Sequence, residues 1–283
     1  MRVRPAAVAG TWYPGTAGAL KRELESYLDA ADVARSSGVE AIIAPHAGLM
    51  FSGPVGAYAY KAASRGRYDV AVLVGPSHFM AFDGVSVWSE GQFDSPLGAV
   101  TIHEEAAAEM LRSPIVRDLP AAHQREHSLE MQLPFLRHLL PEVPIVPMLI
   151  GHQGRETIEA LAQVLAAGAA ARRALLIAST DLSHYFDATT AATLDGRVQD
   201  HVTRFDAAGL LDLFETYPEA DRGRCVACGG GAAIAVMMAA HLRGAASGRV
   251  LKYGHSGEVS GDHDGVVGYL AAAFGECQDR DVH

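Results

Sequence analysis

Histidines follow three buried apolar runs, each at the point where a predicted strand ends. "AIIAPH" ends in His46, "VAVLVGPSH" ends in His78, and "ALLIASTDLSH" ends in Asp181 and His184. In open α/β sheets, ligands bind beyond the carboxyl ends of the strands. Neutral imidazole is the commonest protein metal ligand and also a general acid or base. One such histidine would be interpreted as a hydrogen-bonded loop residue, but three in the same topological place indicate a shared site.

The residues around these histidines suit such a site. Pro45 and Pro76 end their strands, because proline cannot donate to a strand ladder. Gly48 lets the backbone pass close to whatever His46 touches. The carboxylate of Asp181 could orient an imidazole through its second ring nitrogen, or it could cap the turn that it begins. The sequence leaves both roles open.

A cysteine pair precedes a helix that opens with glycines, in "RCVACGGGAAIAV". Cys228 lies directly before this predicted helix, and a helix N-terminus favours the thiolate, the form of cysteine that binds metal. Cys225 and Cys228 also form a C-x-x-C pair, which alone could be a redox dithiol or half of a zinc site. Cys277 is solitary, so a four-ligand structural zinc site lacks its second half. Cys228 could also be a small buried residue at a tight helix–strand contact.

Two further segments carry possible ligands with weaker patterns. In "REHSLEMQLP", His127 and Glu130 lie three residues apart on one face of a predicted helix, where they could bind metal or form a surface pair. "GHSGEVSGDHDG" (254–265) adds two histidines and acidic residues, but it lacks the EF-hand spacing and terminal glutamate. Neither segment predicts a metal site alone.

The composition excludes several classes of protein. A formal charge of −10 with scattered Lys and Arg argues against a nucleic-acid partner, which requires a basic patch. No apolar run approaches the ~20 residues of a membrane span, and the first residues lack the hydrophobic core of a signal peptide. Three cysteines in 283 residues are too few for a disulfide scaffold. We therefore expect a cytoplasmic protein without a membrane partner.

The elements that must position these residues alternate along the chain. Apolar periodicity predicts helices over 16–32, 53–65, 104–113, 127–140, 155–171 and 229–244. Short apolar runs predict strands at 41–44, 68–77, 143–151 and 174–179, with two more near the end at 249–258 and 265–274. This alternation favours a layered α/β fold whose mostly parallel central sheet is covered on both faces. We expect one domain over 1–275 and a loose tail over 276–283.

Taken in order, seven motifs resemble those of the Memo family, whose bacterial and archaeal members are labelled AmmeMemoRadiSam system protein B. They are "AGTWYPG", "IIAPHAG", "VGPSH", "EHSLEMQLPF", "STDLSHY", "CGGGA" and "GDHDGVVGY", and the resemblance runs from about Arg4 to Phe274. The family is related in fold to the class III extradiol dioxygenases, which open catechol rings with non-haem iron. The resemblance therefore implies a three-layer α/β/α sandwich with a mixed, mostly parallel sheet.

Carried over by position, the resemblance implies that the metal ligands are His46, His78 and Cys228. His184 matches the general base of the dioxygenases, with Asp181 beside it. The resemblance also implies that His127 lines the same pocket.

The resemblance further implies that Trp12 and Tyr13 lie at the mouth of the pocket, where family members have been proposed to take up peptides. Phe51 stands there where relatives often carry a tyrosine, so a phenolic donor is absent. Cys225 matches no motif position.

Ring-opening dioxygenases bind iron through two histidines and one carboxylate. A thiol as third ligand is softer, favours Cu(I) and would alter the potential of bound iron. The resemblance implies Fe(II) or copper and a dioxygenase-like oxidoreductase that acts on a small molecule. It also implies two partners, a radical SAM protein and an AMMECR-type protein. The alternative is a non-catalytic module that binds a peptide or protein in the same cleft, and a C-x-x-C thiol oxidoreductase is a third hypothesis.

Overall fold

Four parallel strands form the centre of the main sheet, and their residues are almost entirely buried. The computed structural model describes residues 1–34 and 38–276. The central strands are β2 (Val39–Ala44), β9 (Ala174–Ser179), β3 (Val70–Pro76) and β8 (Ile145–Ile150), side by side in this order. Apolar runs of this kind suit strands that are covered on both faces. The predicted strands are present here, and the predicted tail lies outside the described residues except for Glu276.

Antiparallel strands extend the sheet on both sides. On one side β12 (Val266–Gly275) pairs with β2, and β11 (Ser247–His255) and β10 (His184–Phe186) pair with β12. On the other side β4 (Val85–Val87) is antiparallel to β8, and β7 (Val116–Asp118) is parallel to β4. The sheet is therefore mixed with a parallel centre, as the sequence predicts.

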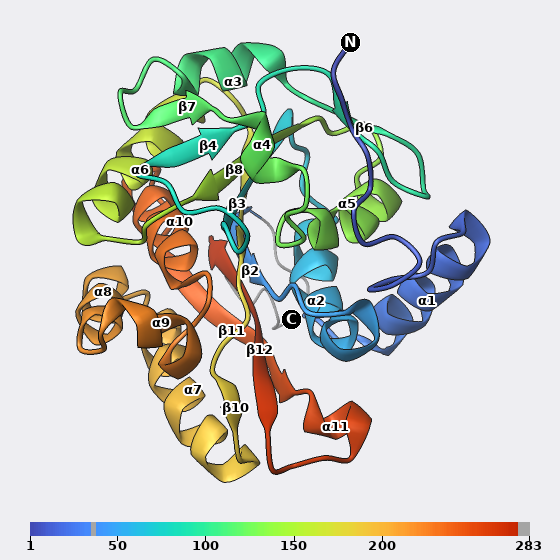
Figure 1. The fold of residues 1–283 in the computed structure, drawn as a ribbon, viewed down its shortest axis with the longest axis vertical. Helices are drawn as coiled ribbons and strands as arrows, with labels where there is room; N and C mark the ends of the chain where they lie inside the picture. The colour runs from blue at the N-terminus through green and yellow to red at the C-terminus, as the bar shows by residue number, and fades with distance from the viewer. Residues whose placement is uncertain (35–37, 277–283) are drawn as a thin grey trace, which may run out of the picture.

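Helices cover both faces of the sheet (Figure 1). On one face α2 (Leu49–Ala63) contacts β2 and β12, with α1 (Ala17–Ala30) and α5 (Leu133–Leu139) packed against it. On the other face α10 (Gly230–Leu242) contacts β9 and β3 and packs against α6 (Arg155–Gly168) and α8 (Ala207–Glu215). In the same layer α7 (Ala188–Thr203) packs on β11 and β12. The fold is a three-layer α/β/α sandwich.

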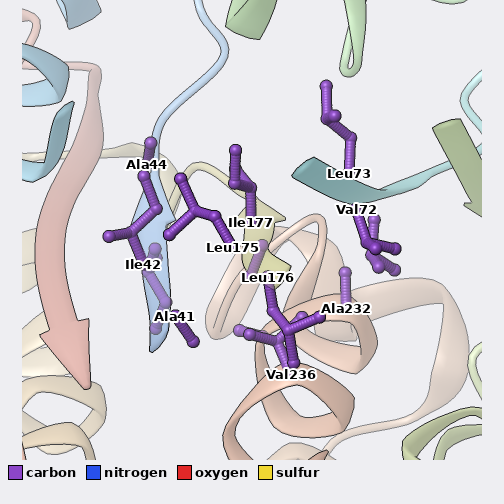
Figure 2. Packing of buried hydrophobic residues seen from close by; sticks show 14 of the residues in the cluster. Ala41, Ile42, Ala44, Val72, Leu73, Leu175, Leu176, Ile177, Ala232 and Val236 are labelled. Atoms are coloured by element: carbon purple, nitrogen blue, oxygen red, sulfur yellow. The ribbon is translucent and has the colours of Figure 1, made fainter. Parts of the chain in front are cut away.

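The hydrophobic core extends over both faces of the sheet, and part of it lies between the sheet and α10. Figure 2 shows Ala232 and Val236 of α10 beside Leu176 of β9. All three side chains are fully buried. Burial of a Leu or Val side chain contributes roughly 1.5–3 kcal/mol, so this contact fixes the start of α10 against the sheet.

The remaining elements are short, and most of them lie in stretches where no helix or strand was predicted. A small second sheet contains β1 (Val3–Arg4), β5 (Gln92–Phe93) and β6 (Val100–Thr101). The helix predicted over 127–140 is shorter: it consists of a 3-10 turn, η1 (Glu130–Gln132), followed by α5. Other short helices are α3 (Glu104–Met110), α4 (Pro120–His123), α9 (Glu219–Cys225) and α11 (Gly257–Ser260).

The apolar helices of the described chain are short. No single helix within residues 1–34 and 38–276 is long and apolar enough to cross a membrane, although α9 and α10 together meet that test across a 79° bend. Most residues of α10 are buried in the protein core.

Candidate metal centre

The ends of β2 and β3 and the start of α10 bring two imidazoles and one thiol together. Ligand atoms of His46, His78 and Cys228 all lie within 4.8 Å of one another. The imidazole rings of His46 and His78 meet edge to face with centroids 5.2 Å apart, and Cys228 Sγ lies 3.1 Å from His46 Nε2. Parallel neighbours β2, β9 and β3 end at the same edge of the sheet, so residues distant in sequence converge there.

His46 is fixed by both its backbone and its ring. Its backbone N–H donates to Asp181 Oδ1 over 2.7 Å, and its Nδ1 lies 2.9 Å from the hydroxyl oxygen of Ser179. The side chain is only 2% exposed. These contacts leave Nε2 as the ring atom that faces Cys228.

A buried carboxylate holds His78 from behind. Glu126 Oε1 accepts from His78 Nδ1 over 2.9 Å, and Oε2 accepts from the backbone N–H of His78 over 2.6 Å. Because a carboxylate at neutral pH only accepts, Nδ1 donates to Glu126, and Nε2 is the ring nitrogen that is left for Cys228 or a metal ion. Burial favours neutral His78, but the hydrogen bonds of its ring to Cys228 and Glu126 outweigh burial and raise the pKa of His78 to about 10. Without metal, Nε2 therefore also carries a proton at neutral pH, and it would have to lose this proton to bind a metal ion.

Cys228 is held at the N-terminus of α10 by contacts from two other loops. The backbone carbonyl of Cys228 accepts from Nε2 of the Gln153 side chain over 2.8 Å. Oε1 of the same side chain accepts from the backbone N–H of Gly231, also over 2.8 Å. The backbone N–H of Asp181 points at Cys228 Sγ over 3.4 Å. Burial raises the pKa of this thiol, but the imidazoles of His46 and His78 outweigh it and lower the pKa to about 6. The thiolate is therefore the favoured form at neutral pH.

His127 stacks on the site without joining the three donors above. Its ring lies parallel to that of His78, 4.5 Å away, and beneath Trp12 at 4.3 Å. Its Nδ1 is buried without a hydrogen bond and lies 3.5 Å from Glu126 Oε1. Burial, aided by His46 and His78, lowers the pKa of His127 to about 3, so the ring is neutral.

His184 reaches the same cavity from β10. Its Nδ1 lies 2.7 Å from the carbonyl oxygen of Leu182, which can only accept, so Nδ1 carries a proton. The opposite atom, Nε2, is then the basic nitrogen of the neutral ring. A ligand atom of His184 lies within 4.8 Å of ligand atoms of Asp181 and Cys228. This geometry places the imidazole of His184 beside one of the three candidate donors.

The carboxylate of Asp181 holds the loop after β2, which is neither the cap of its own turn nor the support of an imidazole ring that the sequence left open. Its Oδ1 accepts from the backbone N–H groups of His46 and Ala47, over 2.7 and 3.3 Å. Burial raises the pKa of this carboxyl group, whereas the charge of His184 and the two backbone donors lower it. Asp181 therefore fixes the loop that carries His46, while Ser179, Glu126 and Leu182 contact the ring nitrogens.

The histidines described above, Asp181 and Cys228 line one cavity of about 510 Å³. The histidines are His46, His78, His127 and His184. Its other lining residues are Trp12, Ala47, Gly48, Tyr185, Gly223, Arg224 and Val267. Trp12 and Tyr185 are 38% and 70% exposed. Tyr185 has a positive φ of 62°, an uncommon conformation for a residue with a side chain. Predicted Trp12 thus lies at the cavity, whereas Tyr185 and Arg224 did not stand out in the sequence.

Tyr13 and Phe51 do not line this cavity, unlike the expectation from the resemblance. Tyr13 is 4% exposed, and its hydroxyl donates to Glu130 Oε1 over 2.7 Å. Glu130 also forms a fully buried ion pair with Arg4. Glu130 therefore anchors the N-terminal segment. Of the two roles left open for His127 and Glu130, a surface pair is wrong because both side chains are buried, and Glu130 faces Arg4 and Tyr13 instead.

The donor set fits a single metal ion. Two metal–ligand bonds of about 2.0–2.3 Å span up to roughly 4.6 Å, which is close to the 4.8 Å limit on the separations of the three donors. Nδ1 of His78 is bonded to a carboxylate behind the ring, an arrangement typical of metal-bound histidines. Cys225 is also a free thiol, but no contact joins it to Cys228 among the described residues.

Sequence reasoning missed the residues behind the ligands. Glu126 stood next to His127 without a periodic pattern that forced it inward, and Ser179 ended a strand like any small residue. Contacts between segments distant in the sequence bring both residues against the imidazoles.

Comparison with known proteins identifies the family of this chain. The model of the family described as "Memo-like protein" matches residues 4–273. A MEMO1 family protein of Nitrosopumilus maritimus is 32% identical over 96% of this chain and 99% of its own length. A MEMO1 family protein of Methanopyrus kandleri is 36% identical over 96% of this chain and 98% of its own.

A solved structure shares the fold. An uncharacterized protein from Escherichia coli K12 superposes with a TM-score of 0.56 at 14% identity, covering 84% of this chain and all of that one. The family match extends over nearly the whole chain and includes every residue of the metal centre. The chain therefore belongs to the Memo family.

Proposed function

We propose that this protein is a metal-dependent, dioxygenase-like oxidoreductase that acts on a small molecule. His46, His78 and Cys228 would hold Fe(II) or copper, and the metal would supply redox chemistry when bound. The observation that carries the proposal is the convergence of two imidazoles and a thiol with a low pKa at one wall of a cavity. Thiolate and imidazole together suit Fe and Cu.

The other residues would act on the bound molecule. Nε2 of His184 is placed to take a proton from a hydroxyl group in the cavity, because Nδ1 already donates to Leu182. The rings of Trp12 and His127, inclined at 48° to each other, form an aromatic wall against which a ring-shaped molecule could pack. Asp181 would keep His46 in place through the backbone.

Metal retention tests the proposal directly. Protein purified without oxygen and offered Fe(II) or Cu(I) is expected to retain a single ion per chain by elemental analysis. His46→Ala should retain none. His152→Ala, at an exposed histidine that pairs with Glu219 outside the centre, should behave as the wild type. If the wild type retains neither metal, the proposal fails.

A second candidate is a non-catalytic module that binds a peptide in the same cleft. The exposed rings of Trp12 and Tyr185 at the cavity favour it, since aromatic side chains are enriched at binding surfaces. In that case, peptides selected against the wild type would bind metal-free protein equally well. His184→Ala would leave their affinity unchanged, whereas Trp12→Ala would weaken it.

The proposal includes a setting in the cell. A reducing cytoplasm would keep Cys225 and Cys228 as free thiols, the state they have in the structure. AMMECR-type and radical SAM proteins are the partners that the family resemblance implies. Co-purification of either with the tagged full-length chain tests that association.

A further inference from the structure

The hydroxyl of Ser179 contacts three polar groups around the metal centre. Ser179 is the last residue of β9 and is fully buried. Its Oγ lies 2.9 Å from His46 Nδ1, 2.8 Å from Gln132 Nε2 and 2.6 Å from the carbonyl oxygen of Ser128. A hydroxyl group donates one hydrogen bond and accepts two. The three contacts therefore use its whole capacity, and only one assignment of protons satisfies them.

Gln132 donates to this hydroxyl. The carboxamide nitrogen of Gln132 also lies 3.0 Å from the carbonyl oxygen of Pro45, which can only accept. Its oxygen, on the opposite side, accepts from the hydroxyl of buried Tyr60 over 2.8 Å. Turning the amide over would bring two carbonyl oxygens together at Pro45. The amide nitrogen must therefore face Ser179, so the Ser179 oxygen accepts there.

The proton of Ser179 points to Ser128. The carbonyl of Ser128 can only accept, and at 2.6 Å two oxygens without a hydrogen between them would repel. The single hydroxyl proton is thus used. His46 Nδ1 must then be the donor in the remaining contact with Ser179.

We propose that Ser179, itself oriented by Gln132, is a positioning residue that keeps the proton of His46 on Nδ1. Nε2 is then the ring nitrogen that presents its lone pair towards Cys228, 3.1 Å away. A histidine binds metal only through a nitrogen without a proton. The assignment of the proton stands alone, and its consequence for metal binding rests on the function proposed above.

Nitrogen NMR of metal-free protein tests the assignment. The parent is Cys228→Ala, in which the thiol no longer competes for the Nε2 proton of His46. The ¹⁵N shifts of the neutral His46 ring should identify Nδ1 as the protonated nitrogen. Since neutral histidine in water favours the Nε2–H form, adding Ser179→Ala should move His46 towards that form. If the parent itself shows Nε2–H at His46, the inference is overturned, whether or not the double variant folds.

Ser52→Ala is the matched control. Ser52 is also buried and donates its hydroxyl to the carbonyl of Ala47, next to His46, but it contacts no imidazole. In the same parent, Ser52→Ala should leave the His46 shifts unchanged. An equal change in both double variants would mean a general loss of packing and would overturn the inference.

Zn²⁺ affinity, measured with the thiol in place, tests the consequence. Loss of a hydrogen bond behind a metal-bound histidine typically costs about 10–100-fold in affinity. Ser179→Ala should show a loss of this size, and Ser52→Ala should show none. A change of tautomer without any loss of Zn²⁺ affinity would contradict the role of His46 as a ligand, while the proton assignment would stand.

Discussion

The carboxylate of Glu126 accepts three hydrogen bonds behind the metal centre. Two come from His78 and the third from the backbone N–H of Ser128. Burial raises the pKa of Glu126, but hydrogen bonds and the charge of His78 outweigh it and lower the pKa to about 2. At the scale of single residues, Glu126 therefore fixes both the ring and the backbone of His78, one of the three candidate ligands.

Glu126→Gln should weaken metal binding by about 10–100-fold. The amide keeps the shape of the side chain. However, its NH₂ group is a donor and would face one of the N–H groups that donate to the Glu126 carboxylate in the wild type, so that hydrogen bond would be lost. Titration with Zn²⁺ measures the loss. Glu219→Gln, beside exposed His152, is the matched control and should have no effect. Unchanged affinity in Glu126→Gln would mean that Glu126 does not position His78.

The thiol of Cys228 should titrate well below an ordinary cysteine. In metal-free protein, the rate of alkylation at Cys228 should reach half its maximum near pH 6, because the lowered pKa favours the thiolate. The stabilisation that this shift gives the folded state is fully present above the unfolded pKa of about 9. It is lost as the pH falls through about 6.

Two variants separate the cysteines in that experiment. Cys228→Ser should abolish the low-pH titration, and Cys225→Ser should leave it intact. Loss of the titration in Cys225→Ser would instead favour the C-x-x-C dithiol hypothesis. A midpoint for Cys228 near pH 9 would show that the imidazoles do not stabilise its thiolate.

At the scale of elements, a glycine lets α10 start against the ends of two strands. A Cβ atom at Gly229 would lie 2.4 Å from the carbonyl oxygen of Ser179 and 3.1 Å from Pro76 Cδ. Ser179 and Pro76 are the last residues of β9 and β3, so room for a Cβ atom at Gly229 could be made only by moving one of these strands. Cys228 precedes this glycine directly, so the close approach also sets the position of the thiol.

Gly229→Ala should destabilise the fold by about 1–3 kcal/mol, as overpacking usually does, and should also weaken metal binding. Gly196→Ala is the control, since a Cβ atom within α7 meets nothing within 4 Å. It should be neutral or stabilising by up to about 1 kcal/mol. Urea unfolding measures both variants. Equal stability of Gly229→Ala and the wild type would contradict the tight contact.

The N-terminal segment is anchored by a buried ion pair. Arg4 and Glu130 pair with both side chains fully buried. Glu130 also accepts from the backbone N–H groups of Ala7 and Val8 and from the Tyr13 hydroxyl. These bonds hold the turn that places Trp12 over His127.

Arg4→Met should cost about 3–5 kcal/mol of unfolding free energy, because it leaves the Glu130 charge buried without its cation. Because Trp12 would lose its fixed position over His127, its side chain should become more exposed. A soluble quencher should then reduce the Trp12 fluorescence more strongly than in the wild type. A Trp88→Phe background isolates the Trp12 emission. A stable variant with unchanged quenching would show that the ion pair does not anchor this segment.

At the scale of the whole molecule, the sequence predicts the layers of the fold and the place of the site. Continuous apolar runs predicted strands that are buried on both faces. If these strands were neighbours, the histidines that follow them would lie close together at one edge of the sheet. The order β2–β9–β3 makes them neighbours. That order depends on packing between distant segments, so no local pattern contains it.

Details within the site depend on tertiary contacts and could not be predicted. The resemblance placed Tyr13 at the pocket mouth, but Glu130 draws its hydroxyl into the core. The sequence left two roles open for Asp181, but because the ends of β2 and β9 lie side by side, its carboxylate instead accepts from the backbone of the loop after β2. The hydrogen bonds that His46 donates to Ser179 and His78 donates to Glu126 each join residues more than 45 positions apart in the sequence.

X-ray absorption spectroscopy tests the central claim most directly. The claim is that His46, His78 and Cys228 bind one ion. Protein loaded with Fe(II) or Cu(I) should show one sulfur and at least two imidazole nitrogens around the metal. In Cys228→Ser, the sulfur contribution should vanish while any metal retained keeps its nitrogens. A metal bound without sulfur in the wild type would contradict the claim.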